Sequence, residues 1–344
     1  MPCCWLPAIP LAEWFYEAGV GENRAALVDQ GSIVEIAIER HGTAPRAGSV
    51  HLAKLVRRFP GSDRSLLTLP GSGDAVGVVP ARFTEGATVK VVVIREAIPE
   101  AGNPKPPVVR IADEEEASGP GPSLLDRLKR SKLSVSYLMP HQPDLLEQAE
   151  WSEWLDRATS GLIPFPGGLL RMSLTPAMTL FDIDGTLSPS ELAVAGAAAA
   201  ARAIRLFDIG GSIGLDLPIA QTGSKSMRAA AAAAVDEWLP QPFERTAVNG
   251  FGFLQIVRQR VRPSLPELMQ SDPVTAAALA LLRRAERTPG HGKLTLNAAP
   301  AVIRRIAAQP DWQEALARRR GCTLLLSERP GAAISDMDVE TEFP

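Results

Sequence analysis

The chain has 344 residues, of which 45% are hydrophobic and 22% charged, and this composition predicts a folded protein of two or three domains. Its three cysteines form no CxxC pair and it has four histidines, which argues against a disulfide framework and a structural zinc site. The formal net charge of −3 gives no overall attraction to nucleic acid, so such a role requires local basic patches. No charge-free and proline-free apolar stretch reaches about 18 residues, and we expect a cytoplasmic protein without a membrane span.

The first part of the chain alternates apolar and polar residues in short runs, which is typical of β-strands. Residues 24–38 alternate around Gln30 and Gly31 and predict a β-hairpin. Glycine, proline, serine and aspartate separate four further runs, at residues 49–56, 65–70, 74–80 and 88–98. This spacing predicts a small β-barrel, so we expect a β-rich domain over residues 1–112.

An acidic cluster followed by Gly-Pro-Gly-Pro occupies residues 113–123. Such a segment packs no core, and it predicts a linker. Helical spacing dominates residues 124–160, and strand patterns alternate with helix patterns from residue 165 onward, which favours a mixed α/β class. We expect an α/β core over residues 124–268 and a small C-terminal α/β region over residues 269–344.

Two alanine-rich helices are expected within that core. The first covers residues 190–208, with Ser190 as candidate N-cap ahead of Glu191. The second covers residues 226–238 and ends before a proline. A short apolar run at residues 212–220 lies between them and predicts a buried strand.

The stretch "TLFDIDGTLSPS", residues 179–190, brings Asp182 and Asp184 out of an apolar run and into a Gly-Thr turn. Two carboxylates at this place suit two chemistries. One aspartate is suited to attack a phosphoryl group as a nucleophile, or the carboxylates are suited to hold a divalent ion. A third interpretation is structural, because aspartates near glycine often only cap turns.

The letters "LFDIDGTL" resemble the opening motif of haloacid-dehalogenase-type phosphatases. That resemblance implies Asp182 as nucleophile and Asp184 as acid/base. It also requires a Ser or Thr, a lysine and a later acidic pair from distant parts of the chain. Thr222 and Lys225 fit loosely, while no Gly-Asp-x-x-x-Asp follows and the acidic stretch at 335–340 lies in the tail.

A longer part of the chain resembles the catalytic region of the ribonuclease E/G family, whose members are Mg²⁺-dependent endoribonucleases. Five stretches match the family in order, at residues 24–40, 89–102, 162–185, 203–217 and 250–265. The resemblance implies an OB-type RNA-binding barrel, inserted in or preceding an RNase-H/DNase-I-like α/β core. It implies cleavage of single-stranded RNA in RNA processing or decay.

Under this resemblance Asp182 and Asp216 align with the two metal-binding aspartates. Mg²⁺, or Mn²⁺ in its place, prefers oxygen ligands and often takes one or two carboxylates. Asp182 is expected to end one strand and Asp216 to lie in a neighbouring strand, which brings them together. Asp184 takes the place of the family's asparagine, thought to orient the attacking water, and an aspartate can accept that water's hydrogen bond or add a third acidic ligand.

Candidate RNA contacts follow from the same resemblance. Arg258, Arg260 and Arg262 lie within five residues, and guanidinium groups take phosphates in bidentate fashion. A solvated charged face is the alternative interpretation. Lys105 falls near a family lysine, and Phe251 lies in the family's Gly-x-Gly turn.

The sequence also departs from the family pattern. Leu67 and Val78 stand where the family offers stacking aromatics, and Gln255 replaces a familiar glutamate. Residues 113–160 contain no Arg-Thr pair for a 5′-phosphate sensor, and the two-cysteine zinc link is absent, so a zinc-linked dimer is not expected. These departures favour a short, divergent member, and they leave open a catalytically weak RNA-binding relic.

Overall fold

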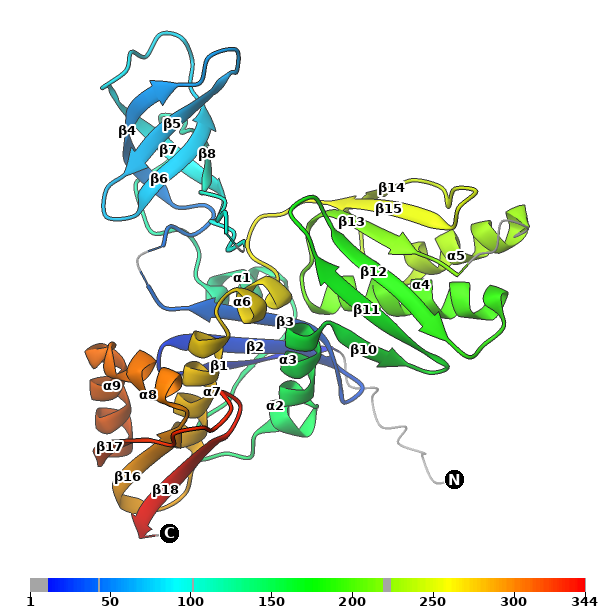
Figure 1. The fold of residues 1–344 in the computed structure, drawn as a ribbon. Coiled ribbons are helices and arrows are strands. Elements are labelled where there is room, and N and C mark those ends of the chain that lie inside the picture. The colour runs from blue at the N-terminus through cyan, green and yellow to red at the C-terminus, as the bar shows by residue number, and fades with distance from the viewer. Residues whose placement is uncertain (1–11, 43, 101, 219–223, 344) are drawn as a thin grey trace, which may run out of the picture. The chain divides into compact units, whose positions relative to one another are not determined.

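The computed structural model describes residues 12–42, 44–100, 102–218 and 224–343 and is a mixed α/β protein with a closed five-stranded barrel (Figure 1). The chain forms two compact units, each built from separated segments. Unit 1 comprises Met1–His41, Leu124–Trp154 and Asp272–Pro344, and unit 2 comprises Gly42–Ser123 and Leu155–Ser271. The domains expected from the sequence follow one another along the chain, whereas each unit of the structure combines segments that are separated in the sequence.

Unit 1 begins with a sheet in the order β3-β2-β1-β9. Its strands are β1 (Glu13–Ala18), β2 (Glu22–Asp29), β3 (Ser32–Arg40) and β9 (Val135–Tyr137). The predicted hairpin is confirmed: Gln30 and Gly31 join β2 to β3 with φ of 50° and 81°, the backbone of a two-residue hairpin turn. Strand β9 was missed, because its three residues lie in a stretch whose periodicity is helical. The short helices beside it are α1 (Leu124–Arg130), α2 (Leu145–Gln148) and α3 (Trp151–Ser160), the last of which runs past the end of the unit.

A second sheet in unit 1 has the order β17-β16-β18. The C-terminal elements are α7 (Pro273–Arg287), β16 (His291–Ala298), α8 (Pro300–Ala307), α9 (Pro310–Arg320), β17 (Thr323–Glu328) and β18 (Met337–Phe343). Leu294 and Leu296 of β16 pack with Leu279 and Leu282 of α7 and with Ile306 of α8 in one buried core. Helices and strands therefore both occur in the C-terminal region expected to be α/β, with two helices between β16 and β17.

The barrel of unit 2 closes in the order β4-β5-β6-β8-β7. Its strands are β4 (Val50–Arg58), β5 (Arg64–Leu69), β6 (Gly73–Val78), β7 (Thr88–Arg95) and β8 (Val108–Ile111). Alternation along the chain predicted the first four. Strand β8 was missed because it has only four residues, yet it closes the barrel by pairing with β6 and β7.

A six-stranded sheet, ordered β10-β11-β12-β13-β15-β14, forms the rest of unit 2. Its strands are β10 (Leu162–Phe165), β11 (Gly168–Leu174), β12 (Thr179–Gly185), β13 (Gly211–Asp216), β14 (Glu244–Arg245) and β15 (Phe253–Arg258). Helices α4 (Pro189–Leu206) and α5 (Lys225–Trp238) cover one face (Figure 1). Small residues bring α4 close to the sheet: a Cβ on Gly196 would lie 2.5 Å from Ile183 of β12.

The N-cap of α4 differs from the one predicted from the sequence. Ser188 is the N-cap, two residues before the expected Ser190, and its amide donates to the Glu191 carboxylate at 3.3 Å. Pro189 at the first helical position favours this start, because its fixed φ suits a helix and its missing N–H would be unpaired there. Among the helices in the described ranges, none is both long and apolar enough to span a bilayer.

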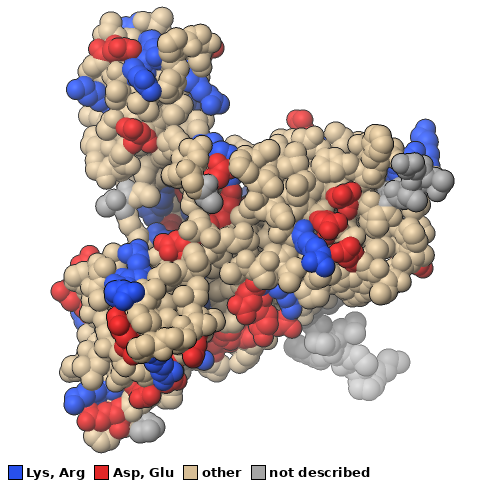
Figure 2. All heavy atoms as spheres, viewed as in Figure 1, with Lys and Arg blue, Asp and Glu red and all other residues tan. Residues whose placement is uncertain are grey.

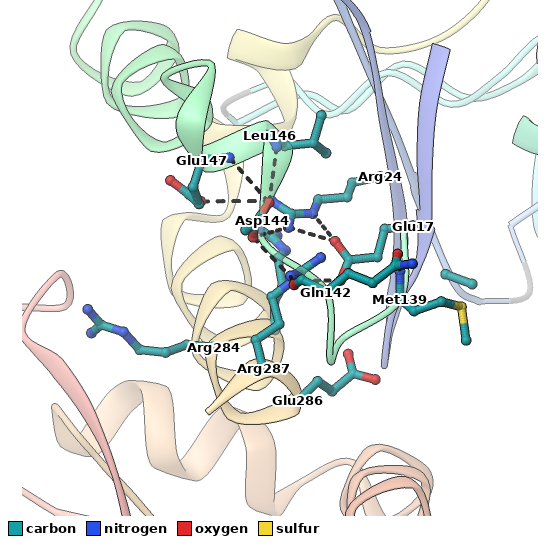
Figure 3. Close-up of polar contacts among 12 residues, drawn as sticks. Glu17, Arg24, Met139, Gln142, Asp144, Leu146, Glu147, Arg284, Glu286 and Arg287 are labelled. Atoms are coloured by element: carbon teal, nitrogen blue, oxygen red, sulfur yellow. Dashed lines mark hydrogen bonds and ion pairs between the residues drawn. The ribbon is translucent and has the colours of Figure 1, made fainter. Parts of the chain in front are cut away.

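A buried network of charged side chains joins the first sheet of unit 1 to α7 (Figure 3). Arg24 of β2 is 1% exposed; its guanidinium donates to Glu17 of β1 at 2.6 Å and to Asp144 at 2.5 Å. Arg287 of α7 donates to the other Glu17 oxygen at 2.9 Å and lies 3.2 Å from Asp144. The Arg24 guanidinium also lies 5.1 Å from the Trp151 ring centroid. The two carboxylates and two guanidinium groups therefore neutralise one another largely shielded from water.

Replacing Arg24 with Met should destabilise unit 1 by about 3–5 kcal/mol, because it leaves the two buried carboxylates of Glu17 and Asp144 with Arg287 as their one remaining cation in this network. Urea unfolding followed by tryptophan fluorescence measures this change, since Trp14, Trp151 and Trp312 all lie in unit 1. The matched control is Arg304→Met: that side chain is 70% exposed, 3.9 Å from Glu328, and its loss should change stability by less than about 0.5 kcal/mol. Equal midpoints for the two variants would contradict the structural role of Arg24.

The same network predicts a dependence of stability on acid. Burial by itself raises the pKa of Asp144, but the charges of Arg24 and Arg287 and hydrogen bonds from Arg24 and the Glu147 amide outweigh it and lower the pKa below its ordinary value of 3.8. The unfolded chain then binds a proton at higher pH than the folded chain does. The contribution of ionised Asp144 is therefore complete above the ordinary pKa and is lost as pH falls through the lowered one.

Asp144→Asn should flatten the loss of unfolding free energy on acidification, because asparagine keeps the N-cap of α2 and cannot titrate. Urea midpoints of the parent and the variant between neutral pH and about pH 3 test this. Parallel curves would show that Asp144 does not contribute to acid sensitivity.

Candidate functional site

Four strands of the unit 2 sheet place one residue each in a row across the sheet. Strand register pairs Arg171 of β11 with Asp182 of β12, Asp182 with Asp216 of β13, and Asp216 with Phe253 of β15. Paired residues in neighbouring strands lie about 5 Å apart and project to the same face. The row therefore holds a guanidinium, two carboxylates and an aromatic ring side by side.

This row lies on the face of the sheet opposite α4 and α5. Phe181, Ile183 and Leu215 alternate with the aspartates and are buried, so Asp182 and Asp216 project to the other face, where both are exposed. Figure 2 shows acidic side chains gathered over this sheet with a basic side chain beside them. The expectation that strand pairing brings the two aspartates together is confirmed, although Asp182 lies inside β12, which continues to Gly185.

The carboxylates of the row differ from that of Asp184. Across the part of the chain that the structure describes, Asp182 and Asp216 form no hydrogen bond or ion pair. Asp184 is two residues along β12 on the same face, and its carboxylate accepts from Arg171 Nε at 2.7 Å. This hydrogen bond raises the pKa of Arg171. Asp182 and Asp216 are thus available to a cation, whereas Asp184 already has one.

The donor set suits a hard divalent ion that keeps most of its water. Two unpaired carboxylates on neighbouring strands offer oxygen atoms from one side only, and Mg²⁺ commonly binds through one or two carboxylates with several waters. Within residues 12–42, 44–100, 102–218 and 224–343, no group of three or more His, Cys, Asp or Glu side chains is placed to hold a metal ion. A site here would use Asp182 and Asp216 alone, with water completing the shell, and Mg²⁺ binding stays a prediction.

Apolar groups border the row. The ring of Phe253 packs over Gly214 of β13: a Cβ there would lie 2.5 Å from the ring and 2.8 Å from Leu180. Because Gly214 has no side chain, the Phe253 ring can pack against its backbone beside Asp216. Gln255 pairs with Gly214 in the next row, so it shares this face and lies next to the candidate site.

The turn before β15 exposes a second aromatic ring. Phe251 is 81% exposed, although large apolar side chains usually avoid water. The Asn249 side chain accepts hydrogen bonds from the amides of Phe251 at 2.9 Å and Phe253 at 3.0 Å, and Gly252 supplies a φ of 86°. The turn is therefore held by its own hydrogen bonds while it presents Phe251 to solvent.

The three arginines expected to contact RNA have partners within the protein. Arg258 lies on the helix side of β15 and donates to two carbonyls, that of Ile204 in the last turn of α4 at 3.5 Å and that of Ile209 just after the helix at 2.9 Å. Such contacts satisfy helix-terminal carbonyls. Arg260 pairs with Glu267 of α6 (Leu265–Ser271), and Arg262 lies 3.4 Å from Asp208. The structure does not bring Arg258 to the face that carries the aspartates.

The barrel residues singled out from the sequence have different surroundings. Lys105 lies 3.1 Å from Glu100 and 3.3 Å from the Pro176 carbonyl, with its side chain 33% exposed. Val78 is on the barrel surface, but Leu67 is fully buried in the barrel core. Leu67 is therefore a core residue and does not stand in for a surface stacking platform.

The phosphatase alternative depends on residues from other parts of the chain. Thr222 lies outside the described residues, and Lys225 begins α5. The late acidic residues Asp336 and Asp338 belong to unit 1, whereas Asp182 belongs to unit 2.

Arg171 is the site residue that the sequence analysis missed. The motif drew attention to the aspartates, and Arg171 lies eleven residues before Asp182 in a strand that is otherwise uncharged. A charged residue within such a run was a usable signal, because the turn at Thr175–Met178 makes β11 and β12 antiparallel neighbours and sets Arg171 opposite Asp182.

No protein-family model matches this chain, and no curated protein sequence shows significant similarity to it. What the site does is therefore inferred from the chain's own residues and their placement.

Gly214→Ala should displace the Phe253 ring and destabilise unit 2 by about 1–3 kcal/mol, because the added methyl overlaps the ring and Leu180. Thermal unfolding followed by circular dichroism measures the loss. Gly250→Ala is the matched control in the neighbouring turn, since a Cβ there meets no described atom within 4 Å. A Gly214 variant as stable as the Gly250 variant would rule out the close packing of Phe253.

Proposed function

We propose that this protein is an endoribonuclease that cleaves single-stranded RNA with Mg²⁺, held by Asp182 and Asp216. One observation carries the proposal: these two aspartates are register partners on neighbouring strands, and their exposed carboxylates have no partner among the described residues. Two like charges held side by side repel each other unless a cation is shared between them.

The chain's residues divide the work of such a site. A bound Mg²⁺ supplies Lewis-acid polarisation of a phosphodiester and of a water molecule. Asp182 and Asp216 hold the ion, and Asp184 keeps one carboxylate oxygen beyond its bond to Arg171, which can accept a hydrogen bond from the attacking water. Phe251 offers its exposed ring for stacking with a base, a contact worth about 1–3 kcal/mol.

The finer architecture belongs to the same proposal. The closed five-stranded barrel suits an OB-type RNA-binding module, and the six-stranded sheet with helices on one face suits a DNase-I-like catalytic core. In support, the barrel (residues 50–111) interrupts the two segments of unit 1 between β3 and α1, as expected for an inserted module.

A non-catalytic RNA-binding relic is the second candidate. Asp184 stands in place of the family's asparagine and is engaged by Arg171, so its remaining oxygen can accept but not donate. A site that binds RNA but positions its water poorly would show affinity without turnover.

Incubation of the purified protein with a labelled, unstructured RNA oligonucleotide should give internal cuts with Mg²⁺ or Mn²⁺ and none with EDTA. Asp182→Asn and Asp216→Asn should each lower the cleavage rate by about 100-fold or more, because losing a ligand removes several kcal/mol of transition-state stabilisation. Asp74→Asn, an exposed aspartate of the barrel, is the control and should cleave normally.

Each alternative has its own outcome in this experiment. Binding of the oligonucleotide without cation-dependent cuts would replace the nuclease with the relic. An acid-stable aspartyl-phosphate on Asp182 after incubation with a phosphomonoester would replace it with the phosphatase. Full activity of both aspartate variants would end the metal-site proposal.

A further inference from the structure

We infer that Arg171 is the phosphate-binding side chain of the Asp182/Asp216 site, and that Asp184 is the partner that orients it. This inference rests on the proposed function for its substrate, a single-stranded RNA backbone. Nothing in the motif of the aspartates points to Arg171, and strand register alone brings it to them.

The position of Arg171 is set by the sheet. Its Cα pairs with that of Asp182, and Asp182 pairs with Asp216 on the other side, so Arg171 lies next to one proposed ligand and two strands from the other. Side chains paired across antiparallel strands have Cβ atoms about 5 Å apart. A phosphate bridging the proposed ion and the protein would therefore be within reach of the guanidinium.

The one side-chain hydrogen bond described for Arg171 leaves its two Nη groups able to donate to a phosphate. Only Nε contacts Asp184, at 2.7 Å, and the two Nη groups have no hydrogen-bond partner among the described residues. The Arg171 side chain is 55% exposed and that of Asp184 57%, so both face solvent. Nη groups in this state can donate to a phosphate oxygen, which is the usual use of a fixed arginine beside a polyanion.

Arg171 also lowers the net negative charge of the face that carries the aspartates. Asp182, Asp184 and Asp216 together carry three negative charges on one face, which repel an approaching RNA backbone. A divalent ion removes two of them and Arg171 removes the third. The site is then neutral toward the phosphates, and Nη donors provide direct attraction.

A purely electrostatic role is the competing explanation, in which Arg171 only neutralises Asp184. The double variant Arg171→Leu/Asp184→Asn separates the two roles, because the pair is neutral both in the parent and in the double variant. Neutralisation alone predicts that the double variant binds RNA like the parent. Phosphate contact predicts that it binds as weakly as Arg171→Leu.

The experiment measures binding of a fluorescein-labelled, unstructured RNA oligonucleotide by anisotropy, with Ca²⁺ in place of Mg²⁺ and separately with EDTA. Arg171→Leu should weaken binding by about 10-fold or more, since a charge-assisted hydrogen bond is lost. The slope of log Kobs against log salt concentration should become shallower by about 0.7, which corresponds to one phosphate contact fewer on a single strand. Arg171→Lys should bind with intermediate affinity, because it keeps the charge without the fork.

Arg245→Leu is the matched control. Arg245 pairs with Asp236 in the same unit, and its removal should leave affinity and salt slope unchanged. Parent-like binding by Arg171→Leu, or restored binding in the double variant, would overturn the inference. Neither result depends on cleavage. Absence of cation-dependent cuts by the parent protein would refute the proposed function, and retained cleavage by the aspartate variants would refute the metal site, while the binding test of Arg171 is unaffected by either outcome.

Discussion

Parallel pairing of β12 with β13 is the constraint on which the candidate site depends. Parallel neighbours cannot be joined by a tight turn, so the chain crosses over through α4 between them. That helix, with α5, covers one face of the sheet and buries the apolar residues of both strands. Side chains alternate between the two faces along a strand, so the residues between the buried ones lie on the uncovered face. The pairing of β12 with β13 sets Asp182 beside Asp216 on that face.

The charged network around Arg24 in unit 1 and the aspartate pair of unit 2 differ in burial and in pairing. In unit 1, Arg24 and Glu17 are almost fully buried and are matched by Asp144 and Arg287, so the charges cancel and mainly specify how sheet and helix pack. In unit 2, Asp182 and Asp216 are exposed and form no hydrogen bond or ion pair among the described residues, although Arg171 lies opposite Asp182. Matched buried charge maintains the fold, whereas unmatched exposed charge is the form that a ligand site takes.

Neighbouring rows of the sheet give the site its other properties. Arg171 supplies a cation at one end, Phe253 lies over Gly214 at the other, and Phe251 extends from the adjoining turn. A cation, two carboxylates and a ring thus follow one another across the uncovered face of the sheet. Under the proposed function, Arg171 is placed for a phosphate and the exposed ring of Phe251 for a base of a single strand.

Local patterns in the sequence determined much of this protein. Alternation around Gln30-Gly31 predicted the β2–β3 hairpin, apolar runs predicted most barrel strands, and the aspartate motif indicated Asp182 and Asp184. Each depends on residues close together in the chain, where periodicity and turn chemistry act directly. The short strands β8 and β9 escaped because three or four residues carry too little periodicity.

Only the tertiary structure decided which distant residues meet. Register placed Arg171 opposite Asp182, and strand parity placed Arg258 on the helix side of the sheet, where it binds the end of α4. Unit 1 likewise assembles from three separated segments around Arg24 and Arg287. A sequence states which side chains exist, but shifting a strand by one residue moves every side chain to the other face, and that choice depends on the packing of the whole sheet.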